Sequence, residues 1–164
     1  MKLKNIHIWL FFVVMLMFSS ACHTEYCREN MYIQAVLKLY NYQSQSQPVN
    51  ISGVSVYTMD INGNYLAKLP IDTVTSTLRL VLNPESDTSR YRIVSNYINN
   101  EELVVVHKNT PEFVSAECGC RVKSIIDTAY VANLSFQDSI SIVNHIVDDV
   151  YENENIQIFL RIGE

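Results

Sequence analysis

The chain has 164 residues, with 12 Lys and Arg against 17 Asp and Glu, so its formal net charge is −5 at pH 7. It offers no Lys/Arg cluster to neutralise phosphates, which argues against nucleic acid and against an anionic membrane surface bound by charge alone. Hydrophobic residues make up 48% of the chain, enough for one domain with a sizeable core.

The first residues have the three-part order of a secretory signal. Lys2 and Lys4 come first, an apolar run covers residues 8–18, and small residues follow at 19–21. The apolar run is shorter than the roughly 20 residues that a membrane-spanning helix needs. We therefore predict that residues 1–21 are a cleaved signal peptide.

Cys22 directly follows the small residues, where a lipoprotein signal peptidase cuts after a lipid joins the sulfur. The site resembles a bacterial lipobox, although Ser19 stands where an aliphatic residue is usual. We predict lipidation of Cys22, whose acyl chains would hold the mature protein on a membrane of the bacterial envelope, at the outer membrane. Loss of residues 1–21 would remove two lysines and lower the formal charge from −5 to −7. The alternative is an ordinary signal peptide with Cys22 as a structural thiol.

The mature chain divides into a polar tether at residues 22–30 and a domain at residues 31–164. Apolar residues alternate from Met31 to Leu39, which is typical of a strand with one buried face. A polar loop is expected at residues 43–47, and it ends at Pro48.

The next segments also read as short strands joined by turns. A hairpin is predicted around Asn62-Gly63, the strongest short hairpin signal, between strands that contain Val56 and residues 65–67. Residues 103–106 are apolar on both faces, which places them centrally in a sheet. Further strands are expected at residues 78–82, 91–97, 113–116, 122–126, 140–142 and 155–162, with turns at 83–84 and 99–100 and a break at Pro111.

No segment has a sustained helical stripe, although residues 138–151 leave room for a helical turn or two. About eight short strands at this spacing predict a single antiparallel β-sandwich, Ig-like or a related barrel.

Lipidation of Cys22 would leave three thiols, at Cys27, Cys118 and Cys120. An odd number in an oxidising compartment leaves one cysteine unpaired. A bond between Cys118 and Cys120 would close a strained ring. We therefore expect Cys27 to pair with Cys118 or Cys120, which closes a loop of about 90 residues.

Two sharper readings of these cysteines remain open. Cys118 and Cys120 could act as a thiol-disulfide redox pair, because a strained disulfide exchanges readily. No thioredoxin-like βαβ context accompanies them. Zinc could be held by the three thiols and a histidine, but the spacing fits no familiar zinc pattern, so we expect no metal and no cofactor.

No catalytic constellation is evident. His107 and His145 have no nearby serine in a Gly-x-Ser-x-Gly context. Acidic pairs at residues 101–102 and 148–149 would point to opposite faces of a strand, so we interpret them as solvated turn charges rather than a glycosidase pair. We predict no catalytic residue and a non-enzymatic binding or scaffolding domain.

Ten tyrosines suggest an alternative role in carbohydrate binding, because tyrosine suits wet interfaces. Four of them lie close together near the first strand: Tyr26, Tyr32, Tyr40 and Tyr42. The simpler interpretation is that they are strand residues of a half-exposed sheet.

Three tripeptides have the Asp-Ser/Thr-aliphatic pattern used for O-glycosylation of exported proteins in some gut bacteria. Composition alone predicts fewer than about one such tripeptide. The predicted acceptors are Thr73, Thr128 and Ser139.

The sequences FVSAECG at residues 113–119 and NIQIFL at residues 155–160 resemble an uncharacterised family of small envelope lipoproteins from gut-dwelling Gram-negative bacteria, filed as a domain of unknown function. The likeness runs from the signal to the end and includes Cys27. In that family an aromatic residue often follows the Cys-Gly pair, where this chain has Cys120. The resemblance therefore favours a Cys27–Cys118 disulfide with Cys120 free. It also implies a β-rich fold, an envelope location and an envelope protein or glycan as partner, and it implies no activity.

Overall fold

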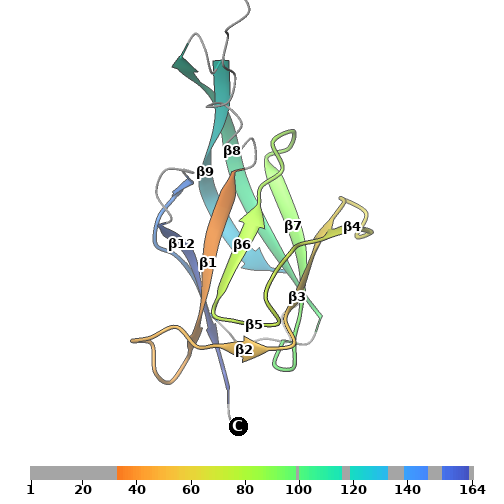
Figure 1. Ribbon diagram of the computed structural model, residues 1–164, viewed down its shortest axis with the longest axis vertical. Coiled ribbons are helices and arrows are strands. Elements are labelled where there is room, and N and C mark those ends of the chain that lie inside the picture. Colours follow the sequence, from red (N-terminus) through yellow and green to blue (C-terminus); the bar gives the residue numbers. More distant parts are fainter. Residues whose placement is uncertain (1–32, 99, 116–118, 133–138, 148–152, 163–164) are drawn as a thin grey trace, which may run out of the picture.

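The computed structural model describes residues 33–162 except residues 99, 116–118, 133–138 and 148–152, and it leaves out the side chains of residues 113–121. Two sheets face each other (Figure 1). One has the order β10 (Ile140–Ile142), β12 (Glu154–Leu160), β1 (Gln34–Asn41) and β6 (Thr77–Val81). The other has the order β11 (Ile146–Val147), β9 (Gly119–Val131), β8 (Glu101–Ser115), β7 (Thr88–Val94), β3 (Ser55–Met59) and β4 (Tyr65–Lys68). β2 (Ile51–Ser52) and β5 (Val74–Thr75) form a two-stranded ribbon.

This arrangement confirms the predicted all-β sandwich. Every pairing among the described strands is antiparallel except that between β1 and β12, which is parallel. Within the described residues no helix is long and apolar enough to span a membrane. Where helical turns were suggested at residues 138–151, the described residues 139–147 form β10, β11 and their connection, and the other residues of this range lie outside the described part.

The core lies between the two sheets and follows the alternation read from the sequence. In β1, Ala35, Leu37 and Leu39 are fully buried, and each buried leucine contributes about 1.5–3 kcal/mol. Lys38 points the other way and lies 3.6 Å from the Glu154 carboxylate. The predicted first strand is therefore confirmed where the structure describes it.

A buried asparagine, Asn155, ties the two sheets together. Its Oδ1 accepts the Val36 N–H at 2.9 Å. Its Nδ2 donates to the carbonyls of Asn144 at 3.1 Å and Ile146 at 2.9 Å. A strand at residues 155–162 was predicted, and β12 lies there, but this polar residue inside the core was not predicted.

The strands β8 and β9 are longer than predicted and form a hairpin that extends beyond the rest of the sandwich (Figure 1). The expected break at Pro111 is wrong. The His107 N–H points away from β9, because it bonds to the Asp87 carbonyl at 2.9 Å, and Pro111 has the same parity along the strand. Pairing of β8 with β7 ends at Val106, so at Pro111 that edge is open and the missing N–H leaves no ladder bond unmade.

Candidate functional site

The β3–β4 hairpin is held by a rigid turn at residues 60–64. Asp60 accepts the N–H groups of Asn62 at 2.9 Å and Asn64 at 2.8 Å, and its other oxygen accepts the Asn64 amide at 2.8 Å. These bonds, the Asn64 side chain first, lower the pKa of Asp60. Gly63 takes φ +86°, which few other residues tolerate. The predicted Asn-Gly hairpin is confirmed.

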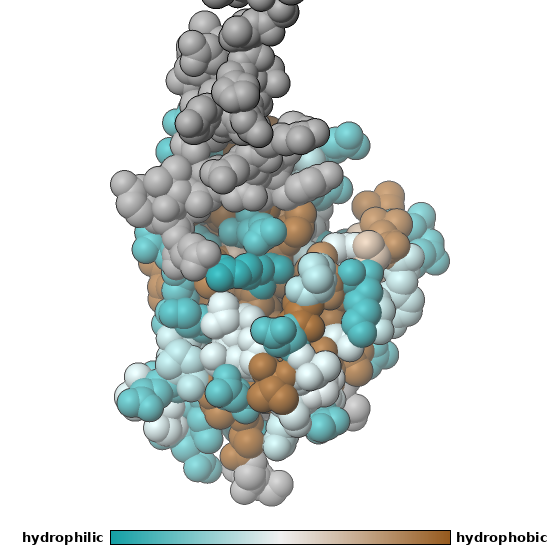
Figure 2. All heavy atoms as spheres, in the orientation of Figure 1, coloured by the Kyte–Doolittle hydropathy of each residue, from teal (hydrophilic) through white to brown (hydrophobic). Residues whose placement is uncertain are grey.

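This hairpin carries the two most exposed large apolar side chains among the described residues, Ile61 and Leu66, together with the exposed Tyr65. Ile61 is 84% exposed, Leu66 is 66% exposed and Tyr65 is 59% exposed. Figure 2 shows hydrophobic atoms gathered at the outer end of this hairpin. Exposed apolar clusters of this kind are typical of interaction sites.

Among the described strands, β4 is an edge strand that pairs only with β3. The Ala67 N–H donates to Thr58 Oγ1 at 3.1 Å, and that hydroxyl donates to the Ala67 carbonyl at 3.3 Å. Leu69 likewise faces β3, because its N–H donates to the Val56 carbonyl at 2.8 Å. Successive residues of a strand alternate in direction, so the N–H and C=O of Lys68 point to the free edge.

A bulge sets the direction of Leu66. In the register of β3 with β4, Thr58 lies opposite Ala67 and Met59 lies opposite Tyr65, so Leu66 is the extra residue. Bulges often re-aim a side chain. Leu66 here lines a cavity on the inner side of the hairpin.

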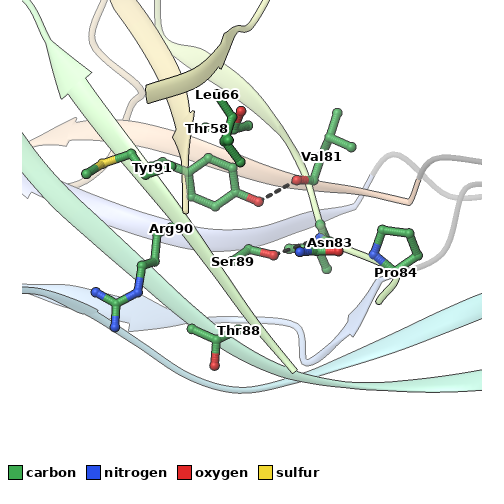
Figure 3. Close-up of a pocket in the computed structure, with 11 residues that line it drawn as sticks. Thr58, Leu66, Val81, Asn83, Pro84, Thr88, Ser89, Arg90 and Tyr91 are labelled. Carbon is green, nitrogen blue, oxygen red and sulfur yellow. Dashed lines mark hydrogen bonds between the residues drawn. The ribbon is translucent and has the colours of Figure 1, made fainter. Parts of the chain in front are cut away.

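The cavity has a volume of about 200 Å³ and lies between the β3–β4 hairpin, β7 and the start of the β6–β7 loop. In Figure 3 Leu66 and Thr58 lie on one side of it, and Asn83 and Pro84 lie on another. Tyr91 also lines it, but its hydroxyl already donates to the Val81 carbonyl at 2.6 Å.

Ser89 lines the cavity and belongs to a hydrogen-bonded relay with His107 and Asn109. Ser89 Oγ lies 2.8 Å from His107 Nε2, and His107 Nδ1 lies 3.0 Å from Asn109 Oδ1. An amide oxygen can only accept, so Nδ1 carries the proton and Nε2 accepts the Ser89 hydroxyl. This connectivity is that of a serine nucleophile, a base and an orienting amide.

Other contacts of the same atoms favour a structural clamp. Ser89 Oγ also accepts the Asn83 N–H at 2.8 Å. Asn109 Nδ2 donates to three loop carbonyls, those of Asn83, Pro84 and Ser86, at 2.9 to 3.1 Å. The relay therefore fastens the β6–β7 loop to β7 and β8, and this loop forms one wall of the cavity.

Burial lowers the pKa of His107, and this outweighs the Asn109 hydrogen bond and the charges of Asp87 and Asp127, which act in the opposite direction. The imidazole is therefore neutral near pH 7, as the relay requires. This cluster could not be predicted from the sequence, because Ser89 and His107 meet only through the pairing of β7 with β8. A predicted strand that began at residue 91 left Ser89 outside it.

The outer face of the six-stranded sheet combines charged and aromatic groups. Glu102 bridges Arg90 at 2.8 Å and Arg92 at 3.6 Å. The rings of Tyr57 and Tyr65 meet edge to face, with centroids 5.2 Å apart. This face is the only described place where two tyrosine rings pack directly on each other.

The acidic pair at residues 101–102 is not a pair of solvated turn charges. Both residues belong to β8, where Glu101 is buried and Glu102 joins the arginines of β7. Their side chains point to opposite faces, as predicted, so they cannot act together on one substrate. The second pair, at residues 148–149, lies outside the described residues.

Tyr40 and Tyr42 do not form the exposed tyrosine group that the alternative role in carbohydrate binding would use. Tyr40 is buried, and its hydroxyl donates to the Glu154 carboxylate at 3.1 Å. Burial, followed by this carboxylate, raises the pKa of Tyr40. Tyr42 is partly exposed, with the Arg161 guanidinium 5.1 Å from its ring centroid. Tyr26 and Tyr32 lie outside the described residues.

Of the predicted modification sites, Thr73, Thr128 and Ser139 are all exposed. Cys22, Cys27 and Cys118 lie outside the described residues. Cys120 is described only by its backbone, opposite Phe113 in the β8–β9 hairpin. Among the described residues no three His, Cys, Asp or Glu side chains are grouped to hold a metal ion.

Residues 53–160 match a family of unknown function, DUF6452. The chain belongs to this family. The matched region includes β3, β4, the cavity and the Ser89–His107–Asn109 relay, while Cys22 and Cys27 lie before it. DUF6452 agrees with the expected likeness to a domain of unknown function. No curated protein and no solved structure matches the chain.

Proposed function

We propose that this DUF6452 protein is a lipid-anchored, non-enzymatic binding domain of the bacterial envelope. The single observation that carries the binding role is the β3–β4 hairpin, whose apolar side chains are 59–84% exposed beside an open cavity. A partner that covered them would remove this apolar surface from water. The signal-like residues 1–21 and Cys22 support the anchor.

The anchor is tested by the intact mass of the protein from the membrane fraction of an expressing Gram-negative bacterium. The expected mass is that of residues 22–164 plus acyl groups, and Cys22→Ala abolishes the acyl groups and membrane retention. A protein that keeps residues 1–21, or that is cleaved without acyl groups, contradicts the anchor.

The non-enzymatic role is tested at the Ser89–His107–Asn109 relay, the described cluster closest to a catalytic arrangement. A fluorophosphonate probe reacts with activated serines. We expect no labelling of the purified protein, because Ser89 is buried and already accepts the Asn83 N–H. Labelling that is lost in Ser89→Ala would overturn this part of the proposal.

The second candidate function is carbohydrate binding, favoured by the Tyr57–Tyr65 pair. Lys68 Nζ lies 5.9 Å from the Tyr57 ring centroid, so aromatic and hydrogen-bonding groups share one surface. A glycan array tests it with wild type, Tyr65→Ala and the exposed control Tyr97→Ala. Binding that is lost only in Tyr65→Ala supports this function, and no binding to any glycan removes it.

A further inference from the structure

We infer that a short extended segment of a partner protein docks along the free edge of β4 and places one apolar side chain in the cavity behind Leu66. This inference rests on the proposed binding role and names its partner class. It follows from three features of the site: the free main-chain groups, the unfilled cavity and the limits of the edge.

The free main-chain groups call for another polypeptide. The Lys68 N–H and C=O point away from β3, side by side, to an edge that has no neighbouring strand among the described residues. An added strand satisfies both groups with one residue of its own, which is the geometry of strand addition. A lipid acyl chain has no group that bonds to either.

The cavity calls for an apolar side chain. The polar groups of Ser89 and Tyr91 in its wall are already hydrogen-bonded to the protein, so they offer little to a polar ligand. The remaining wall has the apolar side chains of Met59, Leu66, Val81, Leu82 and Pro84 beside four other polar residues. Of these four, Thr58 and Arg90 are also bonded to the protein. An apolar cavity of about 150 Å³ accepts benzene, so about 200 Å³ has room for a leucine or phenylalanine side chain.

The edge itself limits what can dock there. Pro70 lies two residues after Lys68 and therefore faces the same edge, but it has no N–H to donate. Lysine and proline are typical of edge strands that resist pairing along their whole length. Two copies joined through β4 would share only a few main-chain bonds and would bury too little area for a stable dimer. A short segment with one anchoring side chain gains most of its affinity from that anchor and needs no long edge.

The inference is tested with a phage-displayed library of random twelve-residue peptides, selected on the full chain in detergent micelles. We expect enriched peptides to share one Leu, Ile, Met or Phe position. Hydrogen exchange of the complex should show slowed exchange at the Lys68 amide. No enrichment, or protection confined to residues outside β4 and the cavity wall, would overturn the inference.

Two matched pairs of variants locate the peptide. Leu66→Asp places a charge at the cavity, and Val143→Asp makes the same kind of change at an exposed aliphatic residue outside the hairpin and the cavity wall. We expect at least a tenfold loss of peptide affinity for Leu66→Asp and less than a threefold change for Val143→Asp. Equal effects of the two substitutions contradict docking in the cavity.

Lys68→Pro removes the outward N–H, whereas Lys68→Ala removes the side chain and keeps that group. At least a tenfold loss is expected only for the proline variant, and equal affinities of both variants contradict strand addition. If Lys68→Pro does not fold, the inference is tested by Leu66→Asp with its control and by hydrogen exchange of the wild-type complex.

Sedimentation tests whether the occupant is a second copy of the chain. A dimer of the full chain with slowed hydrogen exchange at the Lys68 amide would show that a second copy occupies the edge, and it would overturn the inference. Failure here would leave the lipid anchor at Cys22 unaffected, because that anchor is read from the intact mass.

Discussion

At the scale of single residues, the structure uses buried polar side chains as fasteners. Ser89, His107 and Asn109 hold the β6–β7 loop, and Asn155 joins the two sheets. Each of these groups has several partners, so the free energy of desolvation is offset by hydrogen bonds. Removing one member leaves the others buried without a partner, and this cost can be measured.

Ser89→Ala should lower the free energy of unfolding by about 1–3 kcal/mol. The substitution leaves the Asn83 N–H and His107 Nε2 without the hydroxyl that both contact. Urea denaturation measures the effect. The control is Ser141→Ala, an exposed serine in β10, which should change stability by less than about 0.5 kcal/mol. Equal effects of the two substitutions would mean that the relay does not fasten the loop.

His107 should make stability depend on pH. Burial lowers its pKa in the folded protein below the ordinary value of 6.5, so the unfolded chain binds the proton more readily. The free energy of unfolding is therefore highest, as far as His107 is concerned, above about pH 6.5. It falls as the pH drops from there towards the lower pKa of His107 in the folded protein. Urea denaturation across this range should show a decline in wild type that is weaker in His107→Gln. A variant with the same slope as wild type would show that another group is responsible.

At the scale of elements, the β8–β9 hairpin and β4 differ most from what alternation alone predicts. Pro111 was predicted to end a strand because the sequence does not show whether its nitrogen faces a neighbouring strand or an open edge. Its nitrogen faces the edge of β8 where pairing with β7 has ended, so the pairing of β8 with β9 continues through Pro111. In β4 all four residues are exposed, so no buried face could mark the bulge at Leu66.

Pro111→Ala should change the free energy of unfolding by less than about 0.5 kcal/mol, since no ladder bond is gained or lost. Val105→Pro should prevent folding, because Val105 is buried and pairs with Ser89 on β7 and with Ala129 on β9. Circular dichroism and urea denaturation compare the two variants. A folded Val105→Pro protein would contradict the central position of β8.

The disulfide prediction also belongs to the β8–β9 hairpin. The Ile33 carbonyl accepts the Leu82 N–H at 2.9 Å, so the N-terminal segment enters beside the loop that Asn109 clamps. Six residues reach at most about 20 Å, and Cys120 lies about 13 Å along β9 from Ser124, which bonds to Asn109. The pairing of Cys27 with a cysteine of the hairpin stays a prediction, because Cys27 and Cys118 lie outside the described residues.

A non-reducing peptide map of the protein exported by its host should join Cys27 to Cys118 and leave Cys120 free. A peptide with Cys118 bonded to Cys120 would instead favour the redox reading. The same map tests O-glycosylation, because unmodified peptides that contain Thr73, Thr128 and Ser139 would remove that hypothesis.

At the scale of the whole molecule, the fold class and most turns could be predicted from the sequence because apolar alternation and turn residues are local signals. Asn62-Gly63 is an example: the hairpin depends on five neighbouring residues. The parallel pairing of β1 with β12 and the contact of Ser89 with His107 join segments that no local signal relates. The cavity was missed for the same reason, since its walls come from four separate strands and a loop.

The described part of the molecule is a sandwich with an open flank beside β4, and the central claim is that this flank contacts a partner in the envelope. Photocrosslinking in the living host tests it most directly, with p-benzoylphenylalanine at position 66 and, as a control, at the exposed Ile125 on β9. The account predicts a discrete crosslinked protein from position 66 alone, which disappears when Lys68→Pro is added. Crosslinks of equal yield from both positions, or none from position 66, would contradict it.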